Sequence, residues 1–214
     1  MSLKEGKKSR NSSAGSSLIS KITICLVYPA LITITKEYFQ TGFPPEIYDI
    51  LSAIQAAFFL SHNIRTNTDF SLIFLAEDLM ITYVGTELRF LGPDERSIGM
   101  LLMKALEKKD RVHNEIKVRS TPGILIQRKR VEDFLDEFQA TSQIILVDND
   151  ADSDLREIPQ KNLTLLIPVI LNGASFNERY LTDQPMLKFK VRDLPQPWKP
   201  SLAILKFYSC IDKL

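Results

Sequence analysis

The sequence predicts a single α/β domain whose mostly parallel sheet is covered by helices. After residue 20, short apolar segments typical of strands alternate with segments whose apolar residues recur every three or four positions, as in helices. The segment Leu163–Leu171 (LTLLIPVIL) is continuously apolar, which is typical of a central strand buried on both faces. A chain of 214 residues that is 44% hydrophobic is large enough for one full-sized core.

The N-terminal segment, residues 1–20, is predicted to be a disordered tail, and residues 21–214 the folded domain. The tail contains seven serines and four basic residues but few apolar ones. It therefore cannot bury enough surface to offset the entropy of ordering. Its basic side chains could contact RNA phosphates, although a solvated leader is the simpler interpretation.

The first part of the domain is predicted to form a strand, a helix and a second strand. Lys21–Tyr28 is rich in β-branched and aromatic residues, and so is Phe70–Ala76. Between them, Glu46–His62 has apolar residues at helical spacing, and Pro44 and Pro45 suit the start of a helix. The apolar face of this helix consists of Ile47, Ile50, Leu51, Ile54 and Phe58.

The next segments are predicted to form a hairpin and a helix. Ile81–Phe90 resembles a hairpin that turns near Gly85. Pro93 and Asp94 then open a helix that runs to about Lys109. Its inward face consists of Ile98, Leu101, Leu102, Ala105 and Leu106.

The second half continues the alternation. Short strands at Ile124–Gln127 and Gln143–Val147 flank a helix at Val131–Gln139. After the continuous apolar run, Leu187–Val191 is predicted to be a strand and Ser201–Asp212 a closing helix. Ligands of such sheets bind beyond the carboxyl ends of the strands, so the site is expected there.

Charge and cysteine content limit the functional classes. The chain has 27 basic and 26 acidic residues, a net charge of +1, so any RNA surface must be a local patch. Cys25 and Cys210 are too few for a disulfide scaffold, which favours a cytoplasmic location. Ile22–Thr35 is too short for a membrane helix and is interrupted by Pro29, so a buried strand is the better interpretation and no membrane partner is expected.

Common catalytic and metal motifs are not found. The aspartates of DNDADSD, residues 148–154, alternate as in a calcium loop, but Ser153 and Pro159 occupy the glycine and glutamate positions. His62 and His113 have no cysteine or carboxylate partners at ligand spacing, so no metal site is predicted. Neither a phosphate-binding glycine loop nor a nucleophile elbow occurs.

Arginines concentrate beside turn residues in three polar segments, residues 61–69, 85–97 and 120–130. Guanidinium groups on loops suit phosphates and base edges, so these arginines could form a local RNA-facing patch. Ordinary surface ion pairing, for example of Arg96 with Asp94 or Glu95, explains them equally well. The candidate RNA-binding residues are Arg65, Arg89, Arg96, Arg128 and Arg130, with Arg119 directly before the third segment.

The same segments carry a family resemblance. The phrases FFLSHNIR, GTELRFLGPDER with the following KALEKKD, and STPGILIQRKR resemble the archaeal tRNA pseudouridine(54) N1-methyltransferases of the SPOUT superfamily. The resemblance covers Ile47–Arg130 and extends through DNDADSDLREI. It implies a SPOUT fold with a C-terminal trefoil knot, the cofactor S-adenosylmethionine (SAM), and tRNA as the substrate. It also implies a homodimer; a heteromer with an active paralogue is the alternative.

The resemblance also suggests site residues. Asp49 lies one position from the family's helix-start acidic residue, where this chain has Tyr48; it is the candidate proton acceptor, and a helix-surface aspartate is the alternative. Trp198 is expected to stack on adenine or to anchor the last helix in the core. The candidate cofactor contacts are Leu171, Asn172, Gly173, Leu194, Pro195 and Ala203.

The cofactor loops depart from the family pattern. Leu202 and Ala203 occupy the positions of a histidine-cysteine pair, and VRDLPQPWKP, residues 191–200, has additional prolines and a tryptophan. A catalytically lapsed paralogue that binds RNA or partners an active subunit is therefore the alternative to an enzyme.

Overall fold

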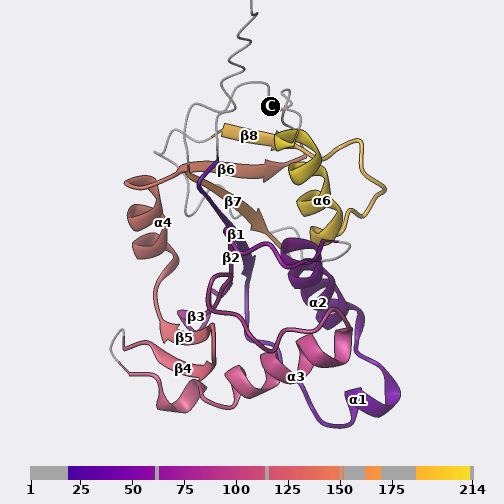
Figure 1. The fold of residues 1–214 in the computed structure, drawn as a ribbon, viewed down its shortest axis with the longest axis vertical. Helices are drawn as coiled ribbons and strands as arrows, with labels where there is room; N and C mark the ends of the chain where they lie inside the picture. The colour runs from indigo at the N-terminus through magenta and orange to yellow at the C-terminus, as the bar shows by residue number, and fades with distance from the viewer. Residues whose placement is uncertain are drawn as a thin grey trace, which may run out of the picture.

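The computed structural model describes residues 19–60, 63–113, 116–149, 151, 162–169 and 187–212. These form an eight-stranded sheet with helices on both faces, which confirms the predicted α/β class (Figure 1). The strands are β1 (Lys21–Tyr28), β2 (Thr68–Phe74), β3 (Leu79–Val84), β4 (Val118–Thr121), β5 (Ile124–Arg128), β6 (Gln143–Asp148), β7 (Asn162–Pro168) and β8 (Leu187–Lys190). Their order across the sheet is β4-β5-β3-β2-β1-β7-β6-β8.

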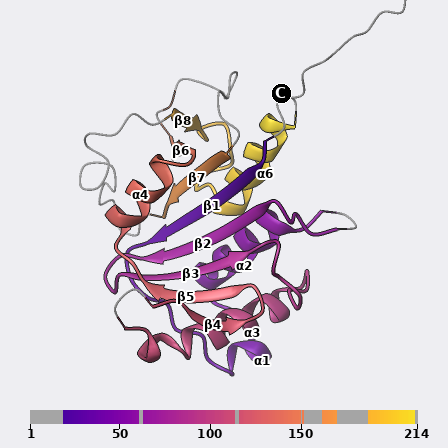
Figure 2. The same cartoon turned by 60° about the vertical axis from the view of Figure 1, so that its left-hand side comes forward.

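The sheet has a parallel part and an antiparallel part. Strand β1 pairs in parallel with β2 and β7, and β6 pairs in parallel with β7 and β8. Strand β3 is antiparallel to β2 and β5, and β4 is antiparallel to β5. Figure 2 shows the antiparallel strands β3, β5 and β4 together at one edge.

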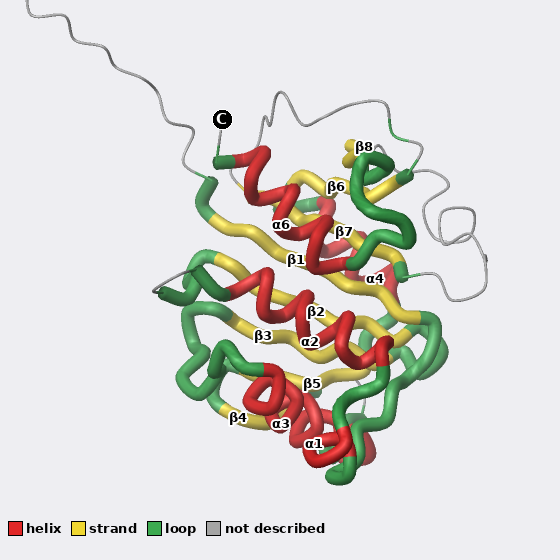
Figure 3. The backbone as a smooth tube through the Cα atoms, turned by 90° about the vertical axis from the view of Figure 1, so that its right-hand side faces the viewer, coloured by secondary structure: helices red, strands yellow, loops and turns green. Residues whose placement is uncertain are grey.

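The helices cover the two faces unequally. They are α1 (Tyr38–Thr41), α2 (Pro45–Phe58), α3 (Glu95–Leu106), α4 (Val131–Gln139) and α6 (Pro200–Ile211), with a 3₁₀ turn at Lys109–Arg111. Figure 3 shows α2, α3 and α6 in front of the sheet and α4 behind it. None of the described helices has the length and apolar character needed to cross a bilayer.

Strand β1 is the centre of two apolar cores. Its side chains alternate in direction, so Ile24 and Leu26 pack with α2, α3 and α6, whereas Cys25 and Val27 pack with Phe134 of α4. Complete burial raises the pKa of the Cys25 thiol, which makes it an unreactive core residue. The strand interpretation of this apolar segment is confirmed for Lys21–Tyr28.

The hairpin predicted at Ile81–Phe90 is wrong. Strand β3 ends at Val84, and its antiparallel partner is β2, reached through a turn in which Asp78 adopts a left-handed φ of 48°. Gly85 instead permits a close approach, because a Cβ there would lie 2.1 Å from the carbonyl oxygen of Thr68.

The first long helix ends earlier than predicted, at Phe58 rather than His62. Phe59 is extended and forms an antiparallel bridge with Ile64, and the Arg65 amide donates to the Phe58 carbonyl at 2.7 Å. This local pairing competes with a further helical turn. His62, the tail before residue 19 and the chain from residue 170 to 186 lie outside the described residues, so the knot stays a prediction.

Candidate functional site

The carboxyl ends of the parallel strands form the edge where a ligand site is expected. The Val169 amide donates to the Val27 carbonyl at 2.8 Å, and the Leu75 amide donates to the Tyr28 carbonyl at 2.9 Å. Strands β7, β1 and β2 therefore end side by side. Backbone loops leaving such an edge can surround a ligand.

Asp49 lies on α2 at this edge. Burial, and then the negative charges of Asp49 and Glu46, raise the pKa of Tyr28, which closes β1. The two carboxylates are thus close to the end of the central strand. The Asp49 side chain is 30% exposed, so a substrate can reach it.

Lys199 brings the loop before α6 to the same place. Its Nζ lies 3.5 Å from Asp49 Oδ1. Since its side chain is 62% exposed, this ion pair contributes little stability. The ion pair instead holds the loop that follows β8 beside the start of α2. Sequence reasoning missed Lys199, which lies far from Asp49 along the chain.

The loop between β8 and α6, together with α6 itself, carries the described half of the predicted cofactor contacts. Leu194 is half-buried and its amide donates to the Val191 carbonyl at 2.9 Å, while Pro195 is exposed. Trp198 is half-buried and packs against the main core, in agreement with the anchoring interpretation. Ala203 is fully buried on the core face of α6.

The remaining predicted cofactor contacts, Leu171, Asn172 and Gly173, lie outside the described residues.

The start of α3 also reaches the start of α2. The Tyr48 hydroxyl donates to Glu95 Oε2 at 3.2 Å, and the Glu95 charge raises the pKa of Tyr48. Asp94 caps α3 by accepting from the Ser97 amide at 2.8 Å. Arg96 forms no ion pair with either acid, contrary to the ion-pair alternative, and is exposed without a partner in the described part of the chain.

Arg65 has a structural role in this fold. Its guanidinium donates to the carbonyls of Ala56, Ala57 and Phe59, at 3.1, 3.4 and 3.4 Å, and so caps the end of α2. It also lies 3.8 Å above the ring of Tyr208 on α6. The guanidinium therefore ties the two helices together.

Arg128 and Arg130 are likewise held by neighbours. Arg128 donates to the Glu77 carbonyl at 2.8 Å and to the Val112 carbonyl at 3.3 Å. Arg130 forms two hydrogen bonds of 2.9 Å with Asp133, which lower the pKa of Asp133 and raise that of Arg130. Arg128 is the last residue of β5 and Arg130 follows it, so both lie about 16 Å or more along the chain from the turn before the strand. The predicted arginines do not form one patch.

Arg89 and Arg119 do come together. They line a depression of about 450 Å³ between the loop after β3 and the turn before β5. Arg119 lies 3.3 Å from Glu87, an exposed pair. The depression is lined by Thr86, Glu87, Arg89, Arg119, Pro122 and Gly123.

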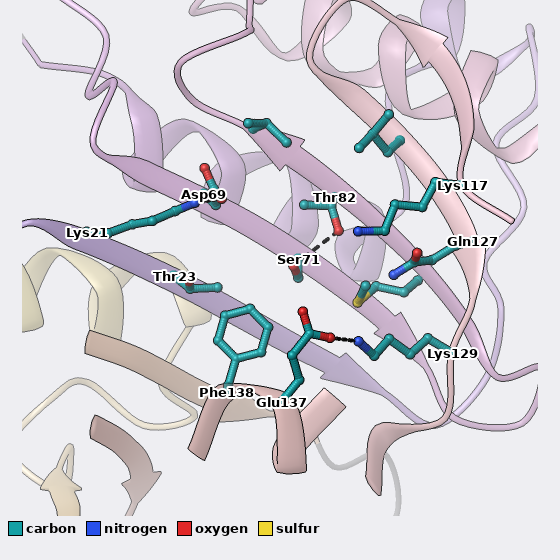
Figure 4. Close-up of a pocket in the computed structure, with 13 residues that line it drawn as sticks. Lys21, Thr23, Asp69, Ser71, Thr82, Lys117, Gln127, Lys129, Glu137 and Phe138 are labelled. Atoms are coloured by element: carbon teal, nitrogen blue, oxygen red, sulfur yellow. Dashed lines mark hydrogen bonds and ion pairs between the residues drawn. The ribbon is translucent and has the colours of Figure 1, made fainter. Parts of the chain in front are cut away.

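A polar pocket of about 220 Å³ lies on the α4 side of the sheet (Figure 4). Figure 4 shows Lys117 and Lys129 extending over its floor, with Lys129 paired to Glu137. Sequence reasoning missed this pocket because its side chains come from separate strands and meet only in the final register. Its polar floor consists of Thr23, Asp69, Ser71, Thr82 and Gln127.

Among the described residues, no group of three or more His, Cys, Asp or Glu side chains could hold a metal ion. Asp148 pairs with Lys188 at 2.8 Å. Asp150, Asp152 and Asp154 lie outside the described residues.

Comparison with known proteins gives matches in sequence and in structure. The model of the family described as "Putative SAM-dependent RNA methyltransferase" matches residues 47–172. The chain is 35% identical over 109 residues to the tRNA (pseudouridine(54)-N(1))-methyltransferase of Haloferax volcanii, covering 51% of this chain and 54% of that protein. The enzyme of the same name from Haloarcula marismortui is 36% identical over 99 residues, 46% of this chain and 50% of that protein. The matches thus span about half the length of these relatives.

The same name belongs to a Methanococcus aeolicus protein that is 28% identical over 155 residues, 68% of this chain and 74% of that protein. Among solved structures, Archaeoglobus fulgidus Nep1 bound to S-adenosylhomocysteine superposes with a TM-score of 0.60 and 11% identity, over 91% of this chain and 98% of that one. At this identity, the superposition shows a shared fold.

Proposed function

Since the chain belongs to the SAM-dependent RNA methyltransferase family, we propose that it transfers a methyl group from SAM to N1 of a pseudouridine in the T-loop of tRNA. The observation that carries the proposal is the arrangement at the carboxyl edge of the parallel strands. There, Asp49 and Lys199 meet at 3.5 Å, next to the loop that carries Leu194 and Trp198. A reachable carboxylate beside an apolar loop suits this reaction.

The cofactor contacts are proposed to be those predicted from the resemblance. Bound SAM would supply an electrophilic methyl group. The described residues Leu194 and Trp198 would shield the adenosine from water at the edge of the core, since both are half-buried there. The full proposed set is Leu171, Asn172, Gly173, Leu194, Pro195 and Ala203.

Asp49 is proposed to take the proton that N1 must lose when it gains the methyl group. A positioned carboxylate acts as a general base when a substrate can come within hydrogen-bonding distance. Its 30% exposure permits that approach. The ammonium of Lys199 beside it would offset negative charge on the deprotonated base.

The RNA contacts are proposed to centre on arginines whose charge is available to phosphates. Arg89 and Arg96 are exposed and have no ion-paired partner among the described residues. Arg65 and Arg128, also predicted as RNA contacts, would add to binding mainly by holding the surrounding backbone, and the predicted contact Arg130 would do so while paired with Asp133. Phosphate contacts of this kind weaken with salt.

A dimer is also proposed, either of two identical chains or of this chain with an active paralogue. Sedimentation velocity of the purified protein, alone and with tRNA, would measure the assembly. A monomer that still methylates RNA would contradict this part of the proposal.

Isothermal titration with SAM and with S-adenosylhomocysteine tests the proposed function. Micromolar binding of both is expected, and it should be unchanged in Asp49→Asn, which keeps the shape of the side chain. No detectable heat together with intact RNA binding would instead favour the lapsed paralogue that serves as an RNA-binding or partner subunit.

A further inference from the structure

We propose that Phe90 is a stacking platform for an unpaired RNA base, and that Arg89 and Arg119 beside it hold the adjoining phosphates. The inference rests on the proposed function, since it concerns the same RNA substrate. It adds a surface that lies outside the proposed methyl-transfer site and that recognises single-stranded nucleotides.

Phe90 is held outward by its neighbours. Its side chain is 66% exposed, more than any other large apolar side chain in the described ranges. Leu91 is 6% exposed and belongs to the main core, and Leu88 packs against that core. Because residues on both sides are anchored inside, the loop presents the ring of Phe90 to solvent. An exposed aromatic face costs hydration free energy unless a partner covers it.

The loop that carries Phe90 is fixed to the sheet. The Glu87 and Leu88 amides both donate to the Val84 carbonyl, at 2.9 and 3.1 Å, and the Val84 amide donates to the Gly123 carbonyl at 2.8 Å. Gly123 has a φ of +80°, and a Cβ there would lie 2.6 Å from the Leu88 nitrogen. The loop and the β4–β5 turn therefore form one preorganised surface, which lowers the entropic cost of binding.

The surroundings of Phe90 carry two arginines and one acid, because Glu87 also lines the depression and pairs with Arg119 at 3.3 Å, an exposed pair that a phosphate can replace. Arg89 and Arg119 line the adjacent depression of about 450 Å³, and the Arg119 side chain is 65% exposed. Lys117 precedes Arg119 by two residues along the chain leading into β4, and Figure 4 shows its side chain over the polar pocket. Lys117 thus adds a basic side chain on the face of the sheet that carries the polar pocket.

This combination fits single-stranded RNA. An aromatic ring stacks on any unpaired base, and arginine forks bind the flanking phosphates. The loop after β3 begins at the opposite end of the sheet from Asp49, since Val84 pairs with Asp69 at the start of β2, and it then runs back along α2. An extended RNA arm can therefore contact Phe90 and Asp49 together. The Gln55 side chain donates to the Pro93 carbonyl at 2.8 Å, which fixes the loop beside α2. Gln55 follows Asp49 by six residues, about 9 Å along the helix axis.

The test is the affinity of the full chain for a fluorescein-labelled T-arm RNA that contains pseudouridine, measured by anisotropy. Phe90→Ala is expected to weaken binding by about 5- to 150-fold, since one stacked base contributes about that much. Phe90→Tyr and Phe90→Trp should retain the affinity. The matched control is Leu187→Ala, an exposed apolar residue on the opposite edge strand, which should have no effect.

Two further readouts separate stacking and phosphate contact from a general effect on folding. The Phe90→Trp fluorescence should be quenched by RNA more than that of the wild-type protein, whose only tryptophan is Trp198. Arg89→Ala and Arg119→Ala should each lower the salt dependence of binding by about one phosphate contact.

Three results would overturn the inference. Unchanged RNA affinity in Phe90→Ala would reject the stacking role while leaving the proposed function intact. A change in oligomeric state without a change in RNA affinity would identify the surface as a contact between protein chains. Failure of the wild-type protein to bind the RNA would reject both the inference and the proposed substrate.

Discussion

The two parts of the sheet differ in what covers them. The parallel strands β1, β7 and β6 lie between helices, with α2 and α6 on one side and α4 on the other. The antiparallel strands β3, β5 and β4 have helical cover on one face. On the other face α4 packs near Met80 of β3 and borders the polar pocket with Glu137 and Phe138, and the pocket leaves part of this face open. The closed part can therefore exclude water from a reaction, whereas the open part can accept a large polar substrate.

The arginines show the same difference at the level of single residues. Arg65 is half-buried and donates to three carbonyls at the end of α2, whereas Arg96 is exposed at the start of α3. Both lie in segments that looked equivalent in the sequence. Their neighbours in the fold give one a structural role and leave the other available for a ligand.

The largest effect is expected at the closed part. Asp49→Ala should lower the methyl-transfer rate by about 10²- to 10⁴-fold, the usual contribution of a general base, with SAM and RNA affinities unchanged. Single-turnover transfer of labelled methyl groups measures the rate. Glu46→Ala, which removes a carboxylate from the same helix and the same end of β1, is the control and should retain activity. A rate close to wild type in Asp49→Ala would assign the proton to another group.

Arg65→Met is expected to destabilise the fold by about 2–4 kcal/mol, because it removes charged hydrogen bonds to the α2 carbonyls and the contact with Tyr208. Urea unfolding followed by circular dichroism measures the free energy of unfolding. The exposed Arg96→Met is the matched control and should change it by less than about 0.5 kcal/mol. Equal stabilities of the two variants would remove the distinction between them.

Tyr208→Phe should lower the free energy of unfolding by about 1–3 kcal/mol near pH 8. The hydroxyl donates to the Ala57 carbonyl at 3.1 Å and lies 2.9 Å from the Thr68 hydroxyl, so its loss leaves buried polar atoms unpaired. Chemical denaturation of both proteins at fixed pH measures the difference.

The same pair of proteins has a testable pH dependence. Burial raises the pKa of Tyr208 to about 12, from about 10 in the unfolded chain. Its stabilisation is therefore complete below about pH 10 and is lost as the pH rises toward 12, because the unfolded state releases the proton first. Wild type should lose more stability across this window than Tyr208→Phe. Equal losses of stability in the two proteins would contradict the burial of the Tyr208 hydroxyl.

The smallest effect is expected at Arg96, which is exposed at the start of α3. Arg96→Ala should weaken tRNA binding by only a few fold, uniformly across RNA sequences, and reduce the salt slope by about one contact. Anisotropy titrations at several salt concentrations measure both quantities. A selective loss for one RNA sequence would indicate that Arg96 reads a base rather than a phosphate.

Much of the fold could be predicted because the spacing of apolar residues along the chain determines where helices and strands form. Helix α4 was predicted with its observed bounds, Val131–Gln139, and β1 with its observed bounds, because their apolar residues follow the helical and strand spacing. The β4 strand was missed because its four residues, Val118–Thr121, are only partly buried or exposed and show no apolar alternation.

The site was harder to predict because it depends on contacts between distant segments. The resemblance pointed to Asp49, but only the fold brings Lys199 beside it. The role of Arg65 depends on where α2 ends. In the predicted helix, which continues to His62, the carbonyls that Arg65 binds would have accepted helical hydrogen bonds instead. Ser71 and Thr82 likewise meet only through strand register.

The most direct test of the central claim is methyl transfer from SAM to two T-arm RNAs that differ only in having pseudouridine or uridine at the target position. Nucleoside mass spectrometry of the products locates the methyl group. N1-methylpseudouridine in the first RNA and no methylation of the second is the expected result. If neither RNA is methylated, or if both are methylated equally, the proposed reaction is contradicted.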